Sequence, residues 1–352
     1  MTILGIHHIT MVCSNAQQTV DFYTRALGLR LVKQTVNFDV PDSYHLYFGD
    51  EAGAPGTLLT FFEWPRAPHG HWGIGATHHL ALTAETPDAQ LKWKRWLTDR
   101  GLRVTGPYDR SYFRSIYFTD PDGLILEIAT RGPGWTVDEA PDALGGRVIM
   151  PRADQMSGGR DEAAIAATTW PGPVQAITPD MRLDGLHHIT AIASDIPATN
   201  AFYTEALGLR LLKKTVNFDN PDAPHYYWGV GDGRPGTIIT YFGYPPQTMR
   251  RGQIGIGLTH HFAFAVEDDE TQLKWADRLR GRGLRVTPVQ DRKYFKSIYF
   301  HDPDGHLVEI ATVPPGFAVD ESRDALGAAL SLPAWLEPQR AEIESTLTPI
   351  VP

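Results

Sequence analysis

Four histidine doublets are the residues of this chain whose type and spacing best suit metal chemistry. They recur along the sequence as His7-His8, His78-His79, His187-His188 and His260-His261. A glutamate lies 48 residues after two of them, at Glu127 (127 − 79) and Glu309 (309 − 261). Two neutral imidazoles and one carboxylate form the facial triad of non-haem Fe(II) oxygenases, and zinc hydrolases use the same set. A lone strand histidine is usually only a hydrogen-bonded structural residue, but the repetition of the whole pattern predicts a metal site.

The doublets belong to a repeat that runs through the whole chain. Gly5–Thr10 recurs as Gly185–Thr190, an offset of 180 (185 − 5), and both segments contain the letters HHIT. Thr77–Leu82 recurs as Thr259–Phe264, an offset of 182 (259 − 77). The chain therefore consists of two similar halves, with two residues gained between these matches.

Each half divides again into two modules of the same pattern. In the first module, a strand over Ile6–Val12 leads to Ser14 or Asn15 as a helix N-cap, and Gly28 ends the helix. Three strand-like runs follow at Leu29–Phe38, Tyr44–Phe48 and Thr57–Phe62. The second module repeats this order with a strand, a helix and three strands at His79–Thr83, Asp88–Arg100, Leu102–Val104, Tyr112–Phe118 and Leu124–Ala129. The pattern predicts an α+β fold of four βαβββ modules.

The module boundaries predict the domain organisation. Residues 151–180 are rich in Gly, Ala, Asp and Pro and are interpreted as a connector. The halves on either side are 1–150, with modules at about 4–65 and 72–130 plus a tail, and 181–352, with modules at about 184–245 and 254–312 plus a C-terminal tail. The sequence leaves open whether modules pair as one with two and three with four, or as one with four and two with three.

Strand alternation assigns different roles to the two histidines of a doublet, because adjacent strand residues point to opposite faces. His260 shares its face with Phe262, which is typical of a packed core. His261 shares its face with Ala263, which is small and leaves room for a cavity. The second histidine of each doublet is therefore the expected cavity residue. Glu309 lies in an otherwise apolar strand, where a charged carboxylate needs a cationic partner such as a metal ion.

Composition and charge exclude several classes of partner. The net charge of −9 argues against nucleic acid and anionic membranes, both of which favour a basic face. No apolar run approaches the roughly 20 residues of a membrane span, and no signal peptide is evident at the N-terminus. A single cysteine, Cys13, permits no intrachain disulfide, which fits a cytoplasmic location. The oligomeric state, including a homo-oligomer, stays open.

The motifs resemble the vicinal oxygen chelate superfamily, which includes type I extradiol dioxygenases, glyoxalase I and antibiotic-resistance proteins. HHIT at the first strand and EIAT at the closing strand carry this resemblance. Tyr44–Phe62, Asp291–Phe300 and the final VEIAT look more specifically like hydroquinone-type ring-cleaving dioxygenases, over nearly the whole chain. The resemblance implies two open-barrel domains and a small aromatic substrate, as in the degradation of aromatic compounds. It also implies Fe(II), with Mn(II) as the alternative ion, and O₂ as co-substrate.

The resemblance also implies roles for individual residues. The metal ligands of this branch fall on His8, His261 and Glu309. Residues that contact substrate or handle protons fall on His7, Thr10, His260, Arg292 and Tyr299. A second set with the same spacing is formed by His188, His79 and Glu127, which the branch does not always keep. The chain is thus expected to bind one metal ion in the first set and is a candidate for a second.

Two other functions compete with an extradiol-type dioxygenase. A glyoxalase-like lyase or isomerase would have a fourth ligand on the last strand of each odd module, but Thr57–Phe62 and Thr237–Phe242 contain no Glu, Gln or Asp. Glu63 lies just beyond the first of these strands, and its repeat mate is Gly243. A metal-free binding protein of the resistance type would not need to keep two complete ligand sets. A dioxygenase is therefore favoured.

Overall fold

A computed structural model describes residues 1–351 and contains the four expected modules. The first module is β1 (Gly5–Cys13), α1 (Ala16–Asp21), β2 (Arg30–Asn37), β3 (Val40–Gly49) and β4 (Leu58–Glu63). The second is β5 (Thr77–Ala84), α2 (Pro87–Asp99), β6 (Thr105–Asp109), β7 (Arg114–Thr119) and β8 (Ile125–Thr130). The third is β9 (Leu183–Ala193), α4 (Ile196–Ala201), β10 (Arg210–Asn217), β11 (Asn220–Gly229) and β12 (Ile238–Gly243). The fourth is β13 (Leu258–Val266), α5 (Asp269–Gly281), β14 (Gln290–Asp291), β15 (Lys296–His301) and β16 (Leu307–Thr312).

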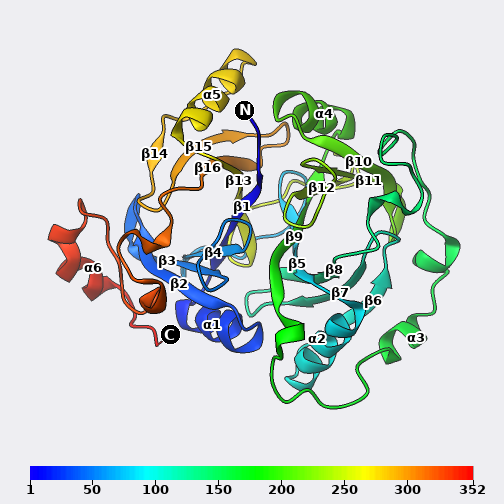
Figure 1. The fold of residues 1–352 in the computed structure, drawn as a ribbon, viewed down its shortest axis with the longest axis horizontal. Coiled ribbons are helices and arrows are strands. Elements are labelled where there is room, and N and C mark those ends of the chain that lie inside the picture. Colours follow the sequence, from blue (N-terminus) through cyan, green and yellow to red (C-terminus); the bar gives the residue numbers. More distant parts are fainter. Residues whose placement is uncertain (352) are drawn as a thin grey trace. The chain divides into compact units, whose positions relative to one another are not determined.

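Unit 1 joins the first module to the fourth and comprises residues 1–71 and 253–352. Its eight strands form one curled sheet in the order β14-β15-β16-β13-β1-β4-β3-β2 (Figure 1). Within the sheet, the first strand of each module, β1 or β13, lies at one edge of that module. These two edge strands pair antiparallel with each other. This pairing satisfies the backbone N–H and C=O groups that an isolated module would leave open at that edge.

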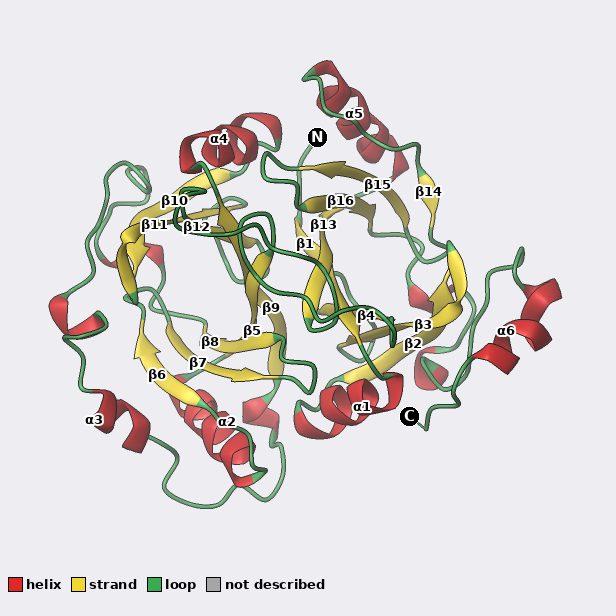
Figure 2. Ribbon diagram, turned by 180° about the vertical axis from the view of Figure 1, so that it is seen from behind, coloured by secondary structure: helices red, strands yellow, loops and turns green. Residues whose placement is uncertain are grey.

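Unit 2, residues 72–252, joins the second module to the third in the same way. Its strand order is β10-β11-β12-β9-β5-β8-β7-β6, and β5 pairs antiparallel with β9. Helices α2 and α4 lie on the outside of this curled sheet (Figure 2). The α+β class with two half-barrel sheets is confirmed. The compact units differ from the sequence halves, because each combines one module from each half.

Local signals place the helices close to the expected positions. Asn15 caps α1 by accepting a hydrogen bond from the backbone N–H of Gln18 at 2.9 Å, and Gly28 ends this segment at φ 69°. The last turn of that segment, Phe22–Ala26, is a π-helix. The prediction of a strand at Leu102–Val104 is wrong. The strand that follows α2 is β6, which begins only at Thr105. Within residues 1–351, no helix is long and apolar enough to cross a membrane.

The connector is a folded part of unit 2 rather than a free linker. It contains the short helix α3 (Glu162–Ala167), and α2 holds it through Lys94. The buried ammonium of Lys94 donates hydrogen bonds to the carbonyls of Ile165, Ala166 and Thr168 at 3.1, 2.9 and 2.7 Å. The equivalent residue of α5 in unit 1 is Ala276 (94 + 182). The structural difference between the units is thus already visible in this one substitution.

Replacing Lys94 with methionine is expected to destabilise unit 2 by about 1.5–3 kcal/mol, since the hydrogen bonds from a charged donor are lost. Urea unfolding measures this change as a lower midpoint. Lys274→Met is the matched control on α5, because Lys274 is exposed and pairs only with Glu270. Equal midpoints for the two variants would contradict a role of Lys94 in holding the connector.

Candidate metal centre

The first histidine of each doublet in unit 1 lies in a β-bulge. The register between β1 and β13 shifts between Ile6 and His8, so it bypasses His7, and a second shift bypasses His260 on β13. A bulge interrupts strand alternation and redirects the side chain. Both rings of each doublet therefore approach each other, and His260 lines the same cavity as His261. Strict alternation predicts that His260 faces the core, on the side of the strand opposite His261, and this prediction is wrong.

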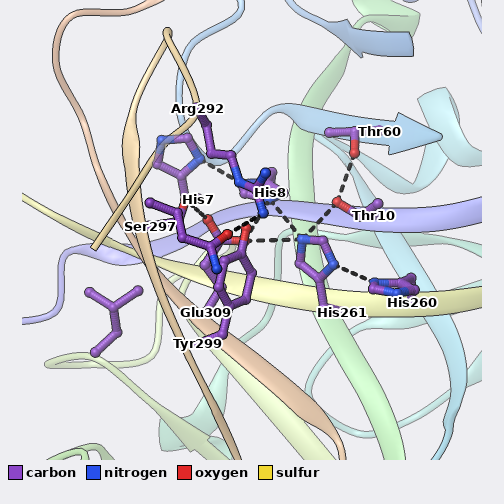
Figure 3. Close-up of polar contacts among 12 residues, drawn as sticks. His7, His8, Thr10, Thr60, His260, His261, Arg292, Ser297, Tyr299 and Glu309 are labelled. Atoms are coloured by element: carbon purple, nitrogen blue, oxygen red, sulfur yellow. Dashed lines mark hydrogen bonds and ion pairs between the residues drawn. The ribbon is translucent and has the colours of Figure 1, made fainter. Parts of the chain in front are cut away.

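His8, His261 and Glu309 converge from β1, β13 and β16 (Figure 3). Glu309 Oε2 lies 3.3 Å from His8 Nε2 and 3.0 Å from His261 Nε2. The two Nε2 atoms are 3.4 Å apart. Ligand atoms about 2.1 Å from one ion, at roughly right angles, lie about 3.0 Å apart. The spacing of these three atoms therefore fits a single ion.

The Oε2 atom of Glu309 lies where a metal ligand would be expected, between the two candidate histidines. This atom is buried and has no hydrogen-bond partner, although both imidazoles are close to it. Three ligand atoms come this close without a hydrogen bond when their lone pairs point at a common centre rather than at each other. Burial alone would raise the pKa of Glu309, but His8 and His261 hold that pKa well below its usual range. The residues present thus fit a divalent cation.

Neighbouring groups orient the three candidate ligands. His7 Nδ1 lies 2.9 Å from His8 Nδ1, and His260 Nδ1 lies 2.8 Å from His261 Nδ1. These contacts leave Nε2 of His8 and His261 directed at the centre. Ser297 on β15 donates a hydrogen bond to Glu309 Oε1 at 2.5 Å. Burial lowers the pKa of His7 to about 3, with His8 adding to the shift, so His7 is neutral near pH 7.

A cavity of about 390 Å³ opens beside this centre in unit 1. Arg292 and Tyr299 line it together with the rings of Phe62 and Phe295. His7 does not line it; its ring packs against Phe295 with a centroid distance of 4.9 Å. The cavity therefore offers apolar ring surfaces next to a few polar groups, as a small aromatic ligand requires.

A tight turn before β15 positions Arg292. Lys293 adopts φ 68° there, and its backbone N–H donates to Asp291 Oδ1 at 2.7 Å. The Arg292 guanidinium donates to Asp39 Oδ2 at 3.0 Å and lies over the Tyr299 ring, 5.6 Å from its centroid. Burial raises the pKa of Tyr299, so its hydroxyl stays protonated near pH 7. Tyr299 is therefore a hydrogen-bond donor and Arg292 a fixed positive charge at the cavity wall.

Sequence reasoning did not single out His45 and Tyr47, which line the cavity from β3. The Tyr47 hydroxyl lies 3.0 Å from His45 Nδ1, and His45 Nε2 lies 3.0 Å from Thr60 Oγ1. Thr60 Oγ1 in turn lies 2.8 Å from Thr10 Oγ1, and Thr10 Oγ1 lies 3.0 Å from His261 Nε2. A continuous line of exchangeable hydrogens thus links the cavity wall to the centre. The repeat contained a signal for it, because His45 recurs as His225 at the offset of 180.

Unit 2 repeats the centre with its own residues. Glu127 Oε2 lies 3.0 Å from His79 Nε2 and 3.4 Å from His188 Nε2, and it too is buried without a hydrogen-bond partner. Ser115 donates to Glu127 Oε1 at 2.5 Å, as Ser297 does in unit 1. The register shifts that bypass His78 and His187 are also present. A cavity of about 370 Å³ lies beside this second centre.

His260→Ala is expected to leave a metal ion bound in unit 1 while lowering turnover, because His260 contacts the candidate ligand His261 through Nδ1 and is not itself one of the three candidate ligands. Loss of such an orienting contact typically lowers activity or metal affinity 10–100-fold. Elemental analysis at saturating metal and steady-state kinetics measure the two effects. Full loss of the ion in His260→Ala, with retention in His261→Ala, would reverse the assignment.

Comparison with known proteins agrees with these observations. Residues 5–128 and 185–310 match the family model of the Glyoxalase/Bleomycin resistance protein/Dioxygenase superfamily. The Bacillus subtilis (strain 168) protein MhqO, provisionally named a ring-cleaving dioxygenase, is 36% identical over 98% of this chain and 96% of its own length. A chlorohydroquinone/hydroquinone 1,2-dioxygenase of Sphingobium indicum is 30% identical over 99% and 97% of the two chains.

Solved structures extend the comparison to the fold. A crystal structure of a Bacillus subtilis protein provisionally described as a dioxygenase is 34% identical, covers 99% of this chain and 98% of its own, and gives a TM-score of 0.78. Maize glyoxalase I superposes with a TM-score of 0.57 at 17% identity over 88% of this chain and 92% of its own. The second likeness concerns the fold alone.

Proposed function

This chain belongs to the Glyoxalase/Bleomycin resistance protein/Dioxygenase superfamily, and on that premise we propose that it is an extradiol-type ring-cleaving dioxygenase. The proposed substrate is a hydroquinone or a catechol-like ring, and the proposed ion is Fe(II), with Mn(II) as the alternative. The names of the similar proteins MhqO and the hydroquinone 1,2-dioxygenase support this reaction class. The proposed ligands in unit 1 are His8, His261 and Glu309.

The observation that carries the proposal is a ligand set of three residues beside an aromatic-lined cavity. Among residues 1–351, the metal-competent group in unit 1 contains His8, His261 and Glu309 and no fourth residue. Glu63 at the end of β4 is engaged elsewhere, because its Oε1 accepts a hydrogen bond from the N–H of Ala16 at 2.9 Å. Three protein ligands on a six-coordinate ion leave three positions, enough for both a phenolic substrate and O₂.

The side chains of the cavity suit the binding of a phenolic ring. Phe62 and Phe295 supply apolar contacts that position the ring, and positioning two reactants is itself a large part of catalysis. Tyr299 can donate a hydrogen bond to an oxygen at the centre, and the positive charge of Arg292 stabilises a substrate phenolate. An Fe(II) ion held by the triad would supply open positions for the ring and O₂ and would let electron density pass from the ring to O₂.

The line from Tyr47 through His45, Thr60 and Thr10 can carry a proton between the cavity wall and the centre. Burial holds the pKa of His45 well below its ordinary value, with His261, His8 and Arg292 adding to the shift. A neutral imidazole has one donor and one acceptor nitrogen, so the line can run in either direction. We assign to it the removal of the substrate hydroxyl proton, which passes from Thr10 through Thr60 and His45 to the Tyr47 hydroxyl, while that hydroxyl releases its own proton into the cavity.

His45→Ala is therefore expected to lower kcat about 100-fold, within the range of general acid–base catalysis, while the bound metal is retained. Added imidazole is expected to restore part of the rate, which a merely structural role would not allow. His301→Ala, which changes an exposed histidine at the end of β15, is the control. Wild-type kcat in His45→Ala would remove His45 from the proposal.

The proposed function is tested by anaerobic reconstitution with Fe(II), followed by measurement of O₂ uptake with a panel of hydroquinones and catechols. The expected result is ring cleavage with both atoms of ¹⁸O₂ in the product. Absence of uptake across the panel, combined with isomerisation of a hemithioacetal, would replace the proposal by a glyoxalase-like reaction.

A further inference from the structure

One substitution changes the hydrogen bonding of a cavity wall between the two units. Asn37 at the end of β2 lines the cavity of unit 1, and its repeat mate Asn217 (37 + 180) lines the cavity of unit 2. Trp64, which follows β4, also lines the cavity of unit 1. Unit 2 has Tyr244 at this position (64 + 180), and Tyr244 does not line its cavity.

In unit 2, the asparagine amide is occupied at both ends. Asn217 Oδ1 accepts a hydrogen bond from the backbone N–H of Asp219 at 2.9 Å. Asn217 Nδ2 donates to the hydroxyl of Tyr244 at 3.2 Å. This amide therefore has its partners within the protein.

In unit 1, only one end of the amide is occupied. Asn37 Oδ1 accepts from the backbone N–H of Asp39 at 3.1 Å, which fixes the orientation of the amide and leaves Nδ2 as its other end. An indole is a donor only, so Trp64 cannot accept a hydrogen bond as Tyr244 does. Within residues 1–351, Asn37 Nδ2 has no hydrogen-bond partner.

The free N–H group of Asn37 is accessible from the cavity. The residue is 9% exposed, yet Nδ2 is not one of the fully buried side-chain atoms that lack a partner, so this atom keeps accessible surface. Because Asn37 lines the cavity and is otherwise buried, that surface faces the cavity. A ligand atom that accepts a hydrogen bond would satisfy it.

Trp64 is held away from any role as an acceptor by its ring contacts. Its indole stacks on Phe62 with a centroid distance of 5.7 Å and an interplanar angle of 3°. It also meets the ring of His260 edge to face at 5.4 Å. The indole thus extends the aromatic wall of the cavity and leaves the neighbouring amide to a ligand.

The charges of the lining favour an uncharged acceptor. Apart from the triad, the fixed charges of the unit 1 lining are Arg292 and Asp39. They pair with each other at 3.0 Å. Asn37 therefore offers a neutral donor beside a neutralised ion pair.

We infer that the cavity of unit 1 recognises an uncharged, hydrogen-bond-accepting substituent on the aromatic ring, such as an alkoxy oxygen, through Asn37 Nδ2. Trp64 determines this preference, because it replaces the tyrosine that occupies the amide in unit 2. The dihydroxylated nature of the ring rests on the proposed function. The accepting substituent rests on the free amide of Asn37 alone.

Anaerobic calorimetric titration of the full, iron-loaded chain tests this inference. All variants carry Glu127→Gln, which is expected to confine the metal to unit 1. The probes are 2-methoxyhydroquinone and 2-ethylhydroquinone, which differ in one ether oxygen in place of a methylene group. Asn37→Asp keeps the acceptor for Asp39 N–H and removes the donor, so the affinity for the methoxy probe relative to the ethyl probe is expected to fall about three- to tenfold.

Trp64→Tyr leaves Asn37 in place but gives it the partner that Asn217 has, and the same ratio is expected to fall. This variant decides the question should Asn37→Asp not fold, which near-UV circular dichroism verifies. Asn220→Asp is the matched control, because Asn220 Oδ1 likewise accepts from the N–H two residues on but lines neither cavity. It is expected to keep the ratio.

An unchanged ratio in the folded variants overturns the inference, also where both affinities fall together, since that result shows a merely structural role. Ring cleavage with an unchanged ratio would sink this inference alone. A ratio that depends on Asn37 without any ring cleavage would sink only the proposed function.

Discussion

Glu309→Gln is expected to lower the metal affinity of unit 1 by more than about 100-fold, because changes in residues that merely orient a ligand already cost 10–100-fold. Ring cleavage of a hydroquinone is expected to fall with it. The carboxylate supplies the one negative charge among the three candidate ligands, and a glutamine would remove it. The Oε2 atom makes no hydrogen bond that the glutamine amide could preserve. Inductively coupled plasma mass spectrometry and O₂ uptake measure the two losses.

Glu63→Gln is the control for this variant, because Glu63 belongs to the same unit but serves to cap the first turn of α1. It is expected to keep the metal. The fold of Glu309→Gln should also persist, since Glu309 is one residue in an apolar strand whose neighbours Val308 and Ile310 are fully buried. Wild-type rates of ring cleavage in Glu309→Gln would contradict the ligand assignment.

The fully reconstituted chain is expected to bind two metal ions, one in each unit. Glu127 is 0% exposed, and its Oε2 atom is buried without a hydrogen-bond partner between His79 and His188. A buried carboxylate without compensation is destabilising by several kcal/mol, and a bound cation removes that penalty. The geometry of the second centre repeats that of the first to within a few tenths of an ångström.

Titration with Fe(II) followed by elemental analysis measures this stoichiometry. Glu127→Gln and Glu309→Gln are each expected to reduce it from two ions to one, and the double variant to none. A ceiling of one ion per chain that Glu127→Gln leaves unaltered would show that the second set is a hydrogen-bonded structural cluster. Because the two single variants are matched in position, each is the control for the other.

The sequence by itself determined the modules and the identity of the candidate ligands. Repetition carried this information, because His79 and His261 stand at the same distance from Glu127 and Glu309. A repeated spacing can be read without coordinates, and so can the period of strands and the caps of helices. The Asn15 cap, the glycine after the first helix and the family of the chain all followed from such local patterns.

Tertiary structure alone decided how the modules pair and what surrounds each centre. Either pairing of the modules would give the edge strand of each module a hydrogen-bonding partner. The strand contacts β1–β13 and β5–β9 show that module one pairs with module four, and module two with module three. The bulges at His7 and His260 arise from the pairing of two distant strands, so no alternation within one strand can reveal them. Arg160 of the connector lines the cavity of unit 2, where it pairs with Asp219 of the third module. These features depend on contacts between residues far apart in the chain, and a local pattern contains no record of them.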